Sequence, residues 1–381
     1  MRIAINANLV SFSGTYRQAG VSKYTELLIN NLGRIDYSGE YLVYFGNGPH
    51  PSDFAAAPNF RLVQSRFNTE KPLIRIAWEQ FIAPFRLLWD RPALLHCPVN
   101  VMPLLAPTPT VITIHDLGFM RFPDRYKKAK RFYLHALTAL SAKRARHLIT
   151  PSEAIRQEVI ELLKIPARRV TAIAEGVSED FKPVPAAEVE KFRREKGLPA
   201  KFVLYVGTLE PRKNLPLLIR AFARWRTENP DDAKGVRLIL GGAKGWFYEE
   251  IFRLVEQFGL TELTDFPGYL READLPLWYN SARCFVYPSV YEGFGLPPLE
   301  AMACGCPVIT SDTSSLPEVV GEAGILVKPD DETGLTAALN RLLTDDAAWS
   351  AYREKGLVQA ARFTWQEAAR QTLGIYRQIV G

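Results

Sequence analysis

Two glutamates bracket a run of glycines and prolines in YEGFGLPPLEAMACGCPV, residues 291–308. Glu292 precedes Gly293 and Gly295, and glycines let backbone N–H groups approach an anionic ligand closely. The two prolines suit the first turn of a short helix, and Glu300 lies one turn into it. Near a phosphate, Glu300 would be repelled unless it accepts hydrogen bonds from another group, such as the diol of a ribose. Glu292, in the loop, could face a sugar.

Two adjacent cations stand where they could neutralise a phosphate. In GTLEPRKNL, residues 207–215, a strand pattern ends at Gly207, and Arg212 and Lys213 come just before the next helical pattern. Cations at the mouth of a helix N-terminus can stabilise a departing diphosphate without a metal ion. Taken alone, Arg212 and Lys213 are equally consistent with an ordinary surface loop. Their interpretation as a phosphate site therefore depends on the presence of residues 291–308 as well.

Several common nucleotide-binding patterns do not occur in the sequence. After the first strand pattern, Gly14 and Gly20 do not have the G-x-G-x-x-G spacing, which argues against a dinucleotide-dependent oxidoreductase. No G-x-x-x-x-G-K-[ST] occurs, and no Asp-x-Asp pair is available to hold a divalent metal on a diphosphate. We therefore expect neither a cofactor nor a bound metal ion.

Short apolar runs that alternate with helical patterns predict the scaffold. They are rich in β-branched residues and bounded by turn residues, as in parallel strands covered on both faces. Strands are predicted in RIAINANLV, YLVYFG, LLHCPV, TVITIHD, HLITPS, KFVLYVG, VRLILGG, LTDFPG, CFVYPS, CPVITS and AGILVK. The predicted fold class is α/β with two doubly wound, Rossmann-like domains, because 381 residues exceed the usual size of one core. Ligands of such sheets bind beyond the carboxyl ends of strands, so we expect a site in a cleft between the domains.

The composition, with 47% hydrophobic and 23% charged residues, is ordinary for a globular protein. The first residues, MRIAINANLV, form too short and too polar a run for a signal peptide or a membrane span. The four cysteines have apolar neighbours, which favours reduced core thiols over disulfides or a metal site. We therefore expect the protein in a reducing cytoplasm. Strand patterns stop in residues 172–188, where Pro, Gly and charges cluster, and this segment is the predicted domain boundary.

The net charge of +6 is unevenly distributed. Residues 1–170 carry 23 Lys and Arg against 12 Asp and Glu, whereas residues 171–381 carry 24 against 29. Much of the excess of Lys and Arg over Asp and Glu lies in residues 121–148. This segment is either a solvated basic face or a surface that binds an anionic membrane or acceptor. The aromatic run at residues 74–90 is either an ordinary amphipathic helix or an acceptor or membrane contact. Nucleic-acid binding is not expected, since no recognition motif occurs.

The E-x7-E pattern in EGFGLPPLEAMACGCPVI, together with GTLEPRKNL and TPSEAIRQEV, resembles the retaining nucleotide-sugar glycosyltransferases of the GT-B fold, specifically the family-four (group 1) enzymes. The likeness covers nearly the whole chain and is densest from residue 200 to 330. FTWQEAARQTLGIYRQIV is similar to the family's last helix, which crosses back onto the N-terminal domain. The resemblance implies an acceptor-binding domain of residues 1–175, completed by helix 364–381, and a donor-binding domain of residues 176–363.

The resemblance also implies roles for matched residues. Glu300 would bind the ribose hydroxyls of the donor, and Glu292 would contact the transferred sugar near its 3-hydroxyl. Arg212 and Lys213 would hold the diphosphate, and His115 would lie near the outer hydroxyls of the sugar. The other matched positions are Gly293, Phe294, Gly295 and Leu296 along the sugar and diphosphate, Gly268, Tyr269 and Leu270 at the base, and Gly20 and Asp116 near the phosphates and acceptor. Thr208 also falls among the expected donor-binding positions, although its residue type differs from the family's.

Two positions depart from the family pattern. Many relatives have an arginine where this chain has Thr208, so Arg212 would have to supply that charge. The usual Asn-Gly before the linker is Glu175 and Gly176 here, which leaves a binding role for that turn in doubt. Taken alone, His115 is more often a hydrogen-bonded structural histidine.

The implied reaction is transfer of a hexose, with retention and without a metal ion, to a hydroxyl of a glycan or lipid-linked acceptor. VGTLEPRKN and TIHDLGF look most like members that move mannose, so GDP-mannose is the favoured donor and a UDP-hexose is the alternative. A nucleotide-sugar epimerase and a non-catalytic binding subunit with the GT-B fold are the rival functions. The expected location is the cytoplasm, with peripheral contact at the inner face of the membrane.

Overall fold

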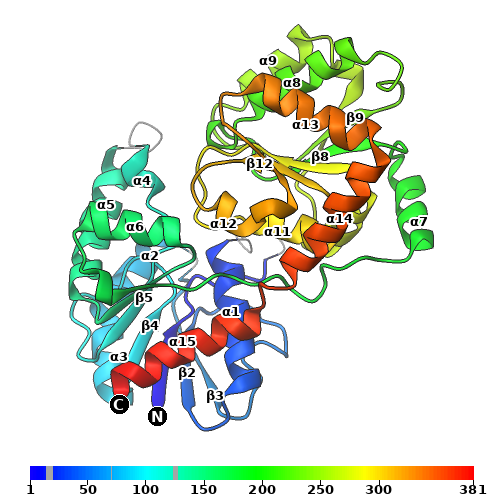
Figure 1. Ribbon diagram of the computed structural model, residues 1–381. Helices are drawn as coiled ribbons and strands as arrows, with labels where there is room; N and C mark the ends of the chain where they lie inside the picture. The colour runs from blue at the N-terminus through cyan, green and yellow to red at the C-terminus, as the bar shows by residue number, and fades with distance from the viewer. Residues whose placement is uncertain (14–19, 70, 123–127) are drawn as a thin grey trace. The chain divides into compact units, whose positions relative to one another are not determined.

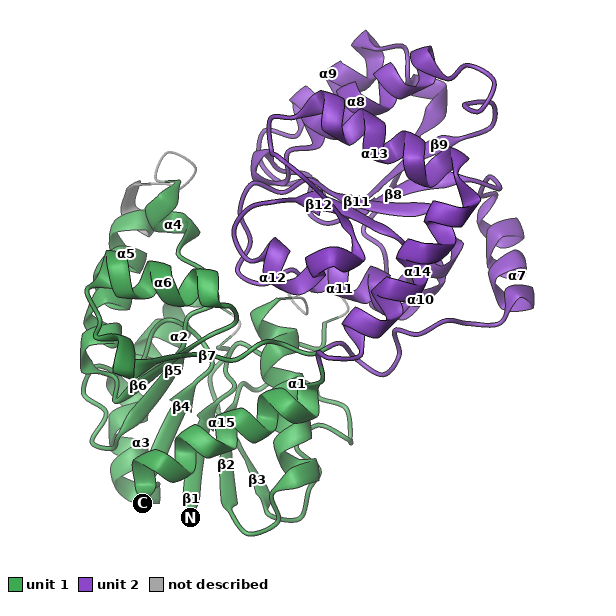
Figure 2. Ribbon diagram, in the orientation of Figure 1, with its two compact units in different colours: residues 1–176, 364–381 green, residues 177–363 purple. Residues whose placement is uncertain are grey.

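A computed structural model describes residues 1–13, 20–69, 71–122 and 128–381 of the chain. The chain forms two compact units, and Figure 2 colours them separately. Unit 1 comprises residues 1–176 and 364–381, and unit 2 comprises residues 177–363. Each unit is a parallel sheet covered by helices, which confirms the predicted class of two doubly wound α/β domains.

Unit 1 is built on a seven-stranded sheet (Figure 1). Its strands are β1 (Arg2–Asn6), β2 (Glu40–Phe45), β3 (Phe60–Gln64), β4 (Leu94–Cys97), β5 (Thr110–Thr113), β6 (His147–Thr150) and β7 (Val170–Ala172). Their order is β3-β2-β1-β4-β5-β6-β7, so the winding reverses between β1 and β4. β3 and β7, the two edge strands of this sheet, are not among the strands predicted from the sequence. Neither has a continuous buried apolar run, because β3 is only partly buried along its length and β7 has three residues.

The helices of unit 1 include one from the far end of the sequence. They are α1 (Val21–Ile35), α2 (Pro72–Ala77), α3 (Ala83–Asp90), α4 (Gly118–Arg121), α5 (Lys128–Arg144), α6 (Glu153–Leu163) and α15 (Trp365–Val380). A π-helical turn, Trp78–Ile82, joins α2 to α3. α15 packs against α1, and the rings of Trp365 and Tyr24 meet edge to face, with centroids 5.6 Å apart. The core of unit 1 is therefore complete only when α15 is in place.

The chain passes between the units at two adjacent places. A Cβ added to Gly176 would lie 2.1 Å from the backbone nitrogen of Trp365, so the outgoing and returning segments touch where only glycine fits. One residue further on, the N–H of Val177 donates to the carbonyl of Phe363 at 3.0 Å.

Unit 2 is built on a six-stranded sheet. Its strands are β8 (Phe202–Val206), β9 (Arg237–Gly241), β10 (Thr264–Gly268), β11 (Cys284–Tyr287), β12 (Val308–Ser311) and β13 (Ile325–Val327). Their order is β10-β9-β8-β11-β12-β13, so the winding reverses between β8 and β11. The residues of β11 are all buried, as are all but the last of β8, which explains why both read as unbroken apolar runs.

Helices cover both faces of this second sheet (Figure 2). They are α7 (Ala186–Lys196), α8 (Leu215–Glu228), α9 (Glu249–Gln257), α10 (Leu275–Ser281), α11 (Leu296–Ala303), α12 (Leu316–Val320), α13 (Glu332–Thr344) and α14 (Asp346–Ala360). α8 packs against α9 and α13, whereas α11 packs against α10 and α14. The four cysteines are buried and form no disulfide. In the described part of the chain, no helix combines the length and apolar character needed to cross a bilayer.

Candidate active site

The predicted donor residues of unit 2 meet at the point where its strand order reverses. Arg212 and Lys213 lie on a 3-10 turn that follows β8, and Glu292 lies in the loop that follows β11. These two strands are neighbours at the reversal, which is where open α/β sheets bind ligands. The loops are tied together, because the N–H of Val290 and the hydroxyl of Ser289 both donate to the carbonyl of Arg212, at 3.0 and 3.1 Å.

The charged side chains at this point form one cluster. Lys213 Nζ lies 2.6 Å from Glu292 Oε1, and Arg212 Nη1 lies 3.0 Å from Glu292 Oε2. Arg212 Nε also pairs with Glu210 at 3.0 Å, while its Nη1 donates to the carbonyl of Tyr291 at 2.6 Å. Two cations are thus balanced by two carboxylates. Lys213 and Glu292 are both buried, so their pairing is shielded from water.

The cluster keeps Glu292 ionised. Burial alone would raise the pKa of Glu292, but Lys213 and Arg212, with a hydrogen bond from Ser289 at 2.5 Å, lower it to about 2. Burial lowers the pKa of Lys213, and the Glu292 carboxylate opposes that shift. The ammonium of Lys213 also donates to the hydroxyl of Tyr287 and lies 4.7 Å from the centre of its ring. The lysine is therefore held by the last residue of β11 and by the loop that follows it.

The loop before α11 presents backbone donors. Gly295 has φ +124°, and a Cβ there would approach Leu316 to 3.0 Å, so both conformation and space favour glycine. The N–H groups of Phe294, Gly295 and Leu296 donate to no acceptor within the described residues. The two residues that follow are prolines, which have no N–H, so these three amides carry the donor capacity of the helix start. They suit the anionic part of a ligand, as the sequence predicts.

Two serines after β12 fix the shape of that loop. The hydroxyl of Ser315 donates to the carbonyls of Glu292 and Phe294, at 3.0 and 2.5 Å, and that of Ser314 to the carbonyl of Glu292 at 2.6 Å. The N–H of Glu292 returns a bond to Ser314 at 3.2 Å. These bonds therefore hold the backbone on either side of Gly293 in its conformation before a ligand binds.

Glu300 stands on α11, partly exposed, with a buried tyrosine behind it. The hydroxyl of Tyr279, on α10, donates to Glu300 Oε2 at 3.1 Å. Burial and the nearby carboxylate raise the pKa of Tyr279, which keeps its hydroxyl a donor. This hydrogen bond orients the carboxylate that the sequence assigns to the ribose.

The predicted base segment lies at the same edge of the sheet, on the strand two places from β8. Gly268 ends β10 with φ +76°, and its carbonyl accepts from the N–H of Gly242 at 2.7 Å. Tyr269 is exposed, whereas Leu270 is buried. Of Leu270, only the backbone is therefore available to a ligand. Thr208, two residues after the end of β8, is exposed.

In unit 1, His115 follows β5 and has neighbours at both ring nitrogens. Nε2 lies 3.1 Å from the carbonyl of Pro98, which can only accept, so Nε2 donates. Nδ1 lies 3.4 Å from Glu175 Oε1, and the ring of Tyr24 meets His115 edge to face at 4.6 Å. Glu175, which departs from the family pattern, is buried and points at the histidine. No motif in the sequence indicates this pairing, which joins residues 60 positions apart.

The two remaining predicted residues of unit 1 have local backbone roles. Asp116 is exposed, and its Oδ1 accepts from the N–H of Gly118 at 2.8 Å, at the start of α4. Gly20 has φ +61° and precedes α1. The rest of the loop before it, residues 14–19, lies outside the described residues, as do residues 123–127 of the basic segment. Among the residues that are described, no three His, Cys, Asp or Glu side chains are grouped to hold a metal ion.

The structure thus brings Arg212, Lys213 and Glu292 into direct contact, where the sequence predicted separate contacts with sugar and diphosphate. It adds the supporting residues Glu210, Ser289, Tyr287, Tyr279, Ser314, Ser315 and Glu175. Glu210 and Ser289 fall inside motifs that the sequence analysis quoted, but nothing in the pattern shows their partners. Their contacts depend on strand order, which only the fold supplies.

Two family descriptions match the chain. "Glycosyl transferases group 1" matches residues 187–359, and "Glycosyltransferase Family 4" matches residues 19–181. O-antigen chain mannosyltransferase B of Escherichia coli is 32% identical over 375 residues, which cover 95% of this chain and 97% of that protein. The serotype-specific mannosyltransferase WbdA of Escherichia coli is 33% identical over 280 residues, 72% of this chain and 34% of that protein. The chain therefore spans about a third of WbdA.

Solved structures share the fold at lower identity. Sucrose-phosphate synthase from Thermosynechococcus elongatus superimposes with a TM-score of 0.77 at 24% identity, covering 99% of this chain and 98% of that one. HepE of Anabaena, in complex with UDP and glucose, superimposes with a TM-score of 0.73 at 18% identity, covering 99% of this chain and 100% of that one. Both likenesses support the GT-B fold. By its fold, its family matches and its relatives, the chain is an enzyme of the group 1 glycosyltransferase family.

Proposed function

We propose that this glycosyltransferase moves mannose from a nucleotide diphosphate sugar to a hydroxyl of a growing glycan, with retention and without a metal ion. The sugar is proposed because O-antigen chain mannosyltransferase B and WbdA are mannosyltransferases by name. The chemistry rests on one observation, the contact of Lys213 and Arg212 with Glu292 at the strand reversal of unit 2. That contact supplies cations for a diphosphate and a carboxylate for a sugar within one cluster.

Donor binding would rearrange the cluster. The diphosphate would replace Glu292 as the partner of Lys213 and Arg212, and the amides of Phe294 and Gly295 would add uncharged donors. Glu292, released from the cations, would accept a hydrogen bond from a hydroxyl of the sugar. The sugar and the diphosphate would therefore bind together. The diphosphate would separate Glu292 from the two cations, and the sugar hydroxyl would give Glu292 a new hydrogen-bond partner.

The transfer step needs little from the protein besides position and charge. The bond between C1 of the sugar and the phosphate oxygen breaks, and its electrons stay on that oxygen, where Lys213 and Arg212 stabilise them. The acceptor hydroxyl attacks the oxocarbenium-like C1 from the same face and gives its proton to the departing phosphate oxygen. The products are the lengthened glycan, with the original anomeric configuration, and a nucleoside diphosphate. His115 would contact the sugar, with Glu175 holding its ring.

The favoured donor is GDP-mannose. In our proposal Glu300, oriented by Tyr279, takes the ribose, and the segment Gly268 to Leu270 takes the base. UDP-hexoses are the alternative, and the related HepE structure contains UDP and glucose. A thermal-shift series with GDP-, UDP- and ADP-sugars separates these donors, since a ligand at a hundred times its Kd stabilises by about 2.7 kcal/mol.

The decisive test of the function is product analysis. Purified protein is incubated with GDP-mannose, a mannose-terminated acceptor and EDTA, and the anomeric configuration of the product is read by NMR. Retained configuration supports the proposal, whereas inversion or complete loss of transfer with EDTA would overturn it. Arg224, an exposed cation on α8 paired with Glu228, provides the control: Arg224→Ala should leave transfer unchanged while Lys213→Ala impairs it.

The rival functions give different products. An epimerase would convert the donor to an isomeric nucleotide sugar without any acceptor. A binding subunit would neither transfer nor slowly hydrolyse the donor. Chromatography of the donor after incubation alone distinguishes both from a transferase.

We further propose that the enzyme works in the cytoplasm, with unit 1 touching the inner face of the membrane. On the helix formed by α2, the π-helical turn and α3, apolar residues recur every four positions and face water. Leu73, Phe81, Phe85 and Trp89 are 82%, 73%, 73% and 84% exposed. Aromatic side chains of this kind anchor proteins at membrane interfaces, and unit 1 is strongly basic. Loss of vesicle flotation in Phe85→Ser/Trp89→Ser would support this contact, and unchanged flotation would contradict it.

A further inference from the structure

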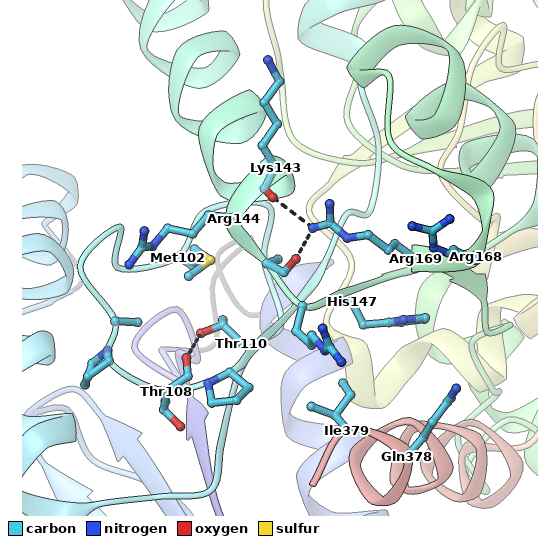
Figure 3. Close-up of a pocket in the computed structure, with 15 residues that line it drawn as sticks. Met102, Thr108, Thr110, Lys143, Arg144, His147, Arg168, Arg169, Gln378 and Ile379 are labelled. Atoms are coloured by element: carbon cyan, nitrogen blue, oxygen red, sulfur yellow. Dashed lines mark hydrogen bonds between the residues drawn. The ribbon is translucent and has the colours of Figure 1, made fainter. Parts of the chain in front are cut away.

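A cavity of about 860 Å³ opens at the amino edge of the sheet of unit 1 (Figure 3). Its walls are the segments that lead into β5, β6 and β7, the end of α5, and residues 378 and 379 of α15. His115 follows the carboxyl end of β5, at the opposite edge of this sheet. The cavity is thus separate from the residues of unit 1 that the transfer reaction uses.

The side chains around this cavity carry one sign of charge. Among the residues that the structure describes, five cations line it, Lys143, Arg144, Arg146, Arg168 and Arg169, and no Asp or Glu does. Within the part of the chain that the structure describes, none of the five is paired with a carboxylate. Other cations of unit 1 are paired, as in Arg156 with Glu153 at 2.6 Å and Arg121 with Glu158 at 2.8 Å.

The fold holds three of these arginines close together. Arg169 Nη2 donates to the carbonyls of Ala142 and Lys143, at 3.1 and 3.0 Å, and to that of Ala145, which fixes it at the end of α5. Figure 3 shows the bond to Lys143. Burial lowers the pKa of Arg169, and the charges of Arg146 and Arg168 lower it further. Burial also lowers the pKa of His147, with Arg169 adding to the shift. Like charges are therefore gathered where no carboxylate of the described residues pairs with them.

From the charge, the size and the fixed arginine we propose that this cavity binds a phosphate group. Guanidinium groups bind phosphate through paired N–H donors, and clusters of them are a common phosphate site. The volume of the cavity is in the range of ordinary ligand sites. The inference does not depend on the transfer reaction, and it gives unit 1 a second ligand.

The surroundings of the cavity connect it to the exposed aromatic helix. Met102 and Thr108, which line the cavity, belong to a loop that is bonded to that helix through Gln80, with Gln80 Nε2 donating to Met102 O at 3.1 Å. Thr108 Oγ1 donates to the carbonyl of Pro92, just after α3, at 2.8 Å. Between them, Leu105 is 72% exposed. A phosphate on a lipid headgroup would meet both cations and apolar side chains here, whereas a soluble phosphate would use the cations alone.

The test reverses two exposed charges of the cavity. Arg146→Glu/Arg168→Glu leaves Arg169 in place, since that residue also caps α5. The control is Arg61→Glu/Arg66→Glu, the same change of charge at two exposed positions elsewhere on unit 1. Each protein is measured by flotation with phosphatidylcholine vesicles, with and without phosphatidylglycerol, and by thermal shift with inorganic phosphate and pyrophosphate.

We expect wild type and control to bind the anionic vesicles alike, and the cavity variant to bind at least about 25-fold more weakly, since the loss of the two cations alone costs about fivefold each. If inorganic phosphate or pyrophosphate stabilises wild type and control but not the cavity variant, while vesicle binding is equal, the site takes a soluble phosphate. Equal binding of all probes by the three proteins, or equal losses in the control, would overturn the proposal. Transfer to a soluble acceptor should persist in the cavity variant, so the outcome is independent of the proposed function.

Discussion

The buried carboxylate of Glu292 should stabilise unit 2 in a way that depends on pH. Its pKa falls from 4.5 to about 2 in the folded chain, where burial opposes the shift and Lys213 and Arg212 drive it. That fall corresponds to about 3 kcal/mol of unfolding free energy. Breaking a buried ion pair by removing one partner costs about 3 to 5 kcal/mol, which is the same range.

Glu292→Gln tests this value with little change in shape. The amide can still accept from Ser289, but it removes the negative charge that Lys213 and Arg212 share, while Arg212 keeps its pairing with Glu210. Because folding lowers the pKa, the stabilisation is fully present above pH 4.5 and disappears as the pH falls toward about 2. Urea unfolding at neutral pH should therefore show the variant less stable by about 3 kcal/mol, with the gap narrowing below pH 4.5.

A control isolates the buried pair from general effects of charge. Glu195 is exposed and lies 3.9 Å from Lys191 on α7, so Glu195→Gln should change the unfolding free energy by less than about 1 kcal/mol. The electrostatic account of the cluster would be refuted if wild type and Glu292→Gln had the same unfolding free energy at neutral pH. It would also be refuted if their difference in unfolding free energy stayed the same at low pH.

The same variant should separate donor binding from transfer. Without the carboxylate, Glu292 no longer competes with a diphosphate for Lys213 and Arg212, so GDP or UDP should bind more tightly than to wild type. Turnover should nevertheless fall about a hundredfold, the scale for losing one transition-state contact. Calorimetry and initial rates measure the two effects, and weaker nucleotide binding would contradict the proposed exchange of partners.

Three further substitutions test individual contacts. Lys213→Ala should lower kcat about a hundredfold in a steady-state assay, and a normal rate would contradict its role at the departing phosphate. Tyr279→Phe removes the hydroxyl that holds Glu300, and should raise the donor KM about tenfold with kcat little changed; a fall in kcat alone would contradict this. Glu175→Gln should reduce kcat/KM about tenfold without lowering the melting temperature, since only the orienting charge beside His115 is lost; unchanged kinetics would make that pairing purely structural.

Much of the scaffold could be read from the sequence because its central strands are buried on both faces. β8 and β11 appear as unbroken apolar runs, and the loops that follow them carry the predicted site residues. The edge strands β3 and β7 could not be recognised in the same way, since partial burial and short length remove that signal. The π-helical turn Trp78–Ile82 also has no local signature, since the residues around it form one continuous helical pattern.

The identities of the site residues could be predicted, but their partners could not. The contact between Lys213 and Glu292 joins positions 79 apart and exists because β8 and β11 are neighbours at the reversal of strand order. Tyr279 reaches Glu300 from a helix that carries no motif. His115 and Glu175 meet for a similar reason, since one follows β5 and the other follows β7, two strands away. Sequence motifs predict which side chains form the site, whereas the ion pairs and protonation states of those side chains depend on tertiary contacts.

The placement of α15 in unit 1 has a consequence for biosynthesis. The nascent chain delivers residues 1–176 first, but the helix that completes their core leaves the ribosome only after all of unit 2 has been translated. At about 5 to 20 residues per second, that delay is roughly 10 to 40 seconds. Unit 2, which is continuous in sequence, can fold during the interval, while the apolar surface that α15 will cover stays exposed. Chaperones that shield nascent apolar surface would therefore matter most for the first half of this enzyme.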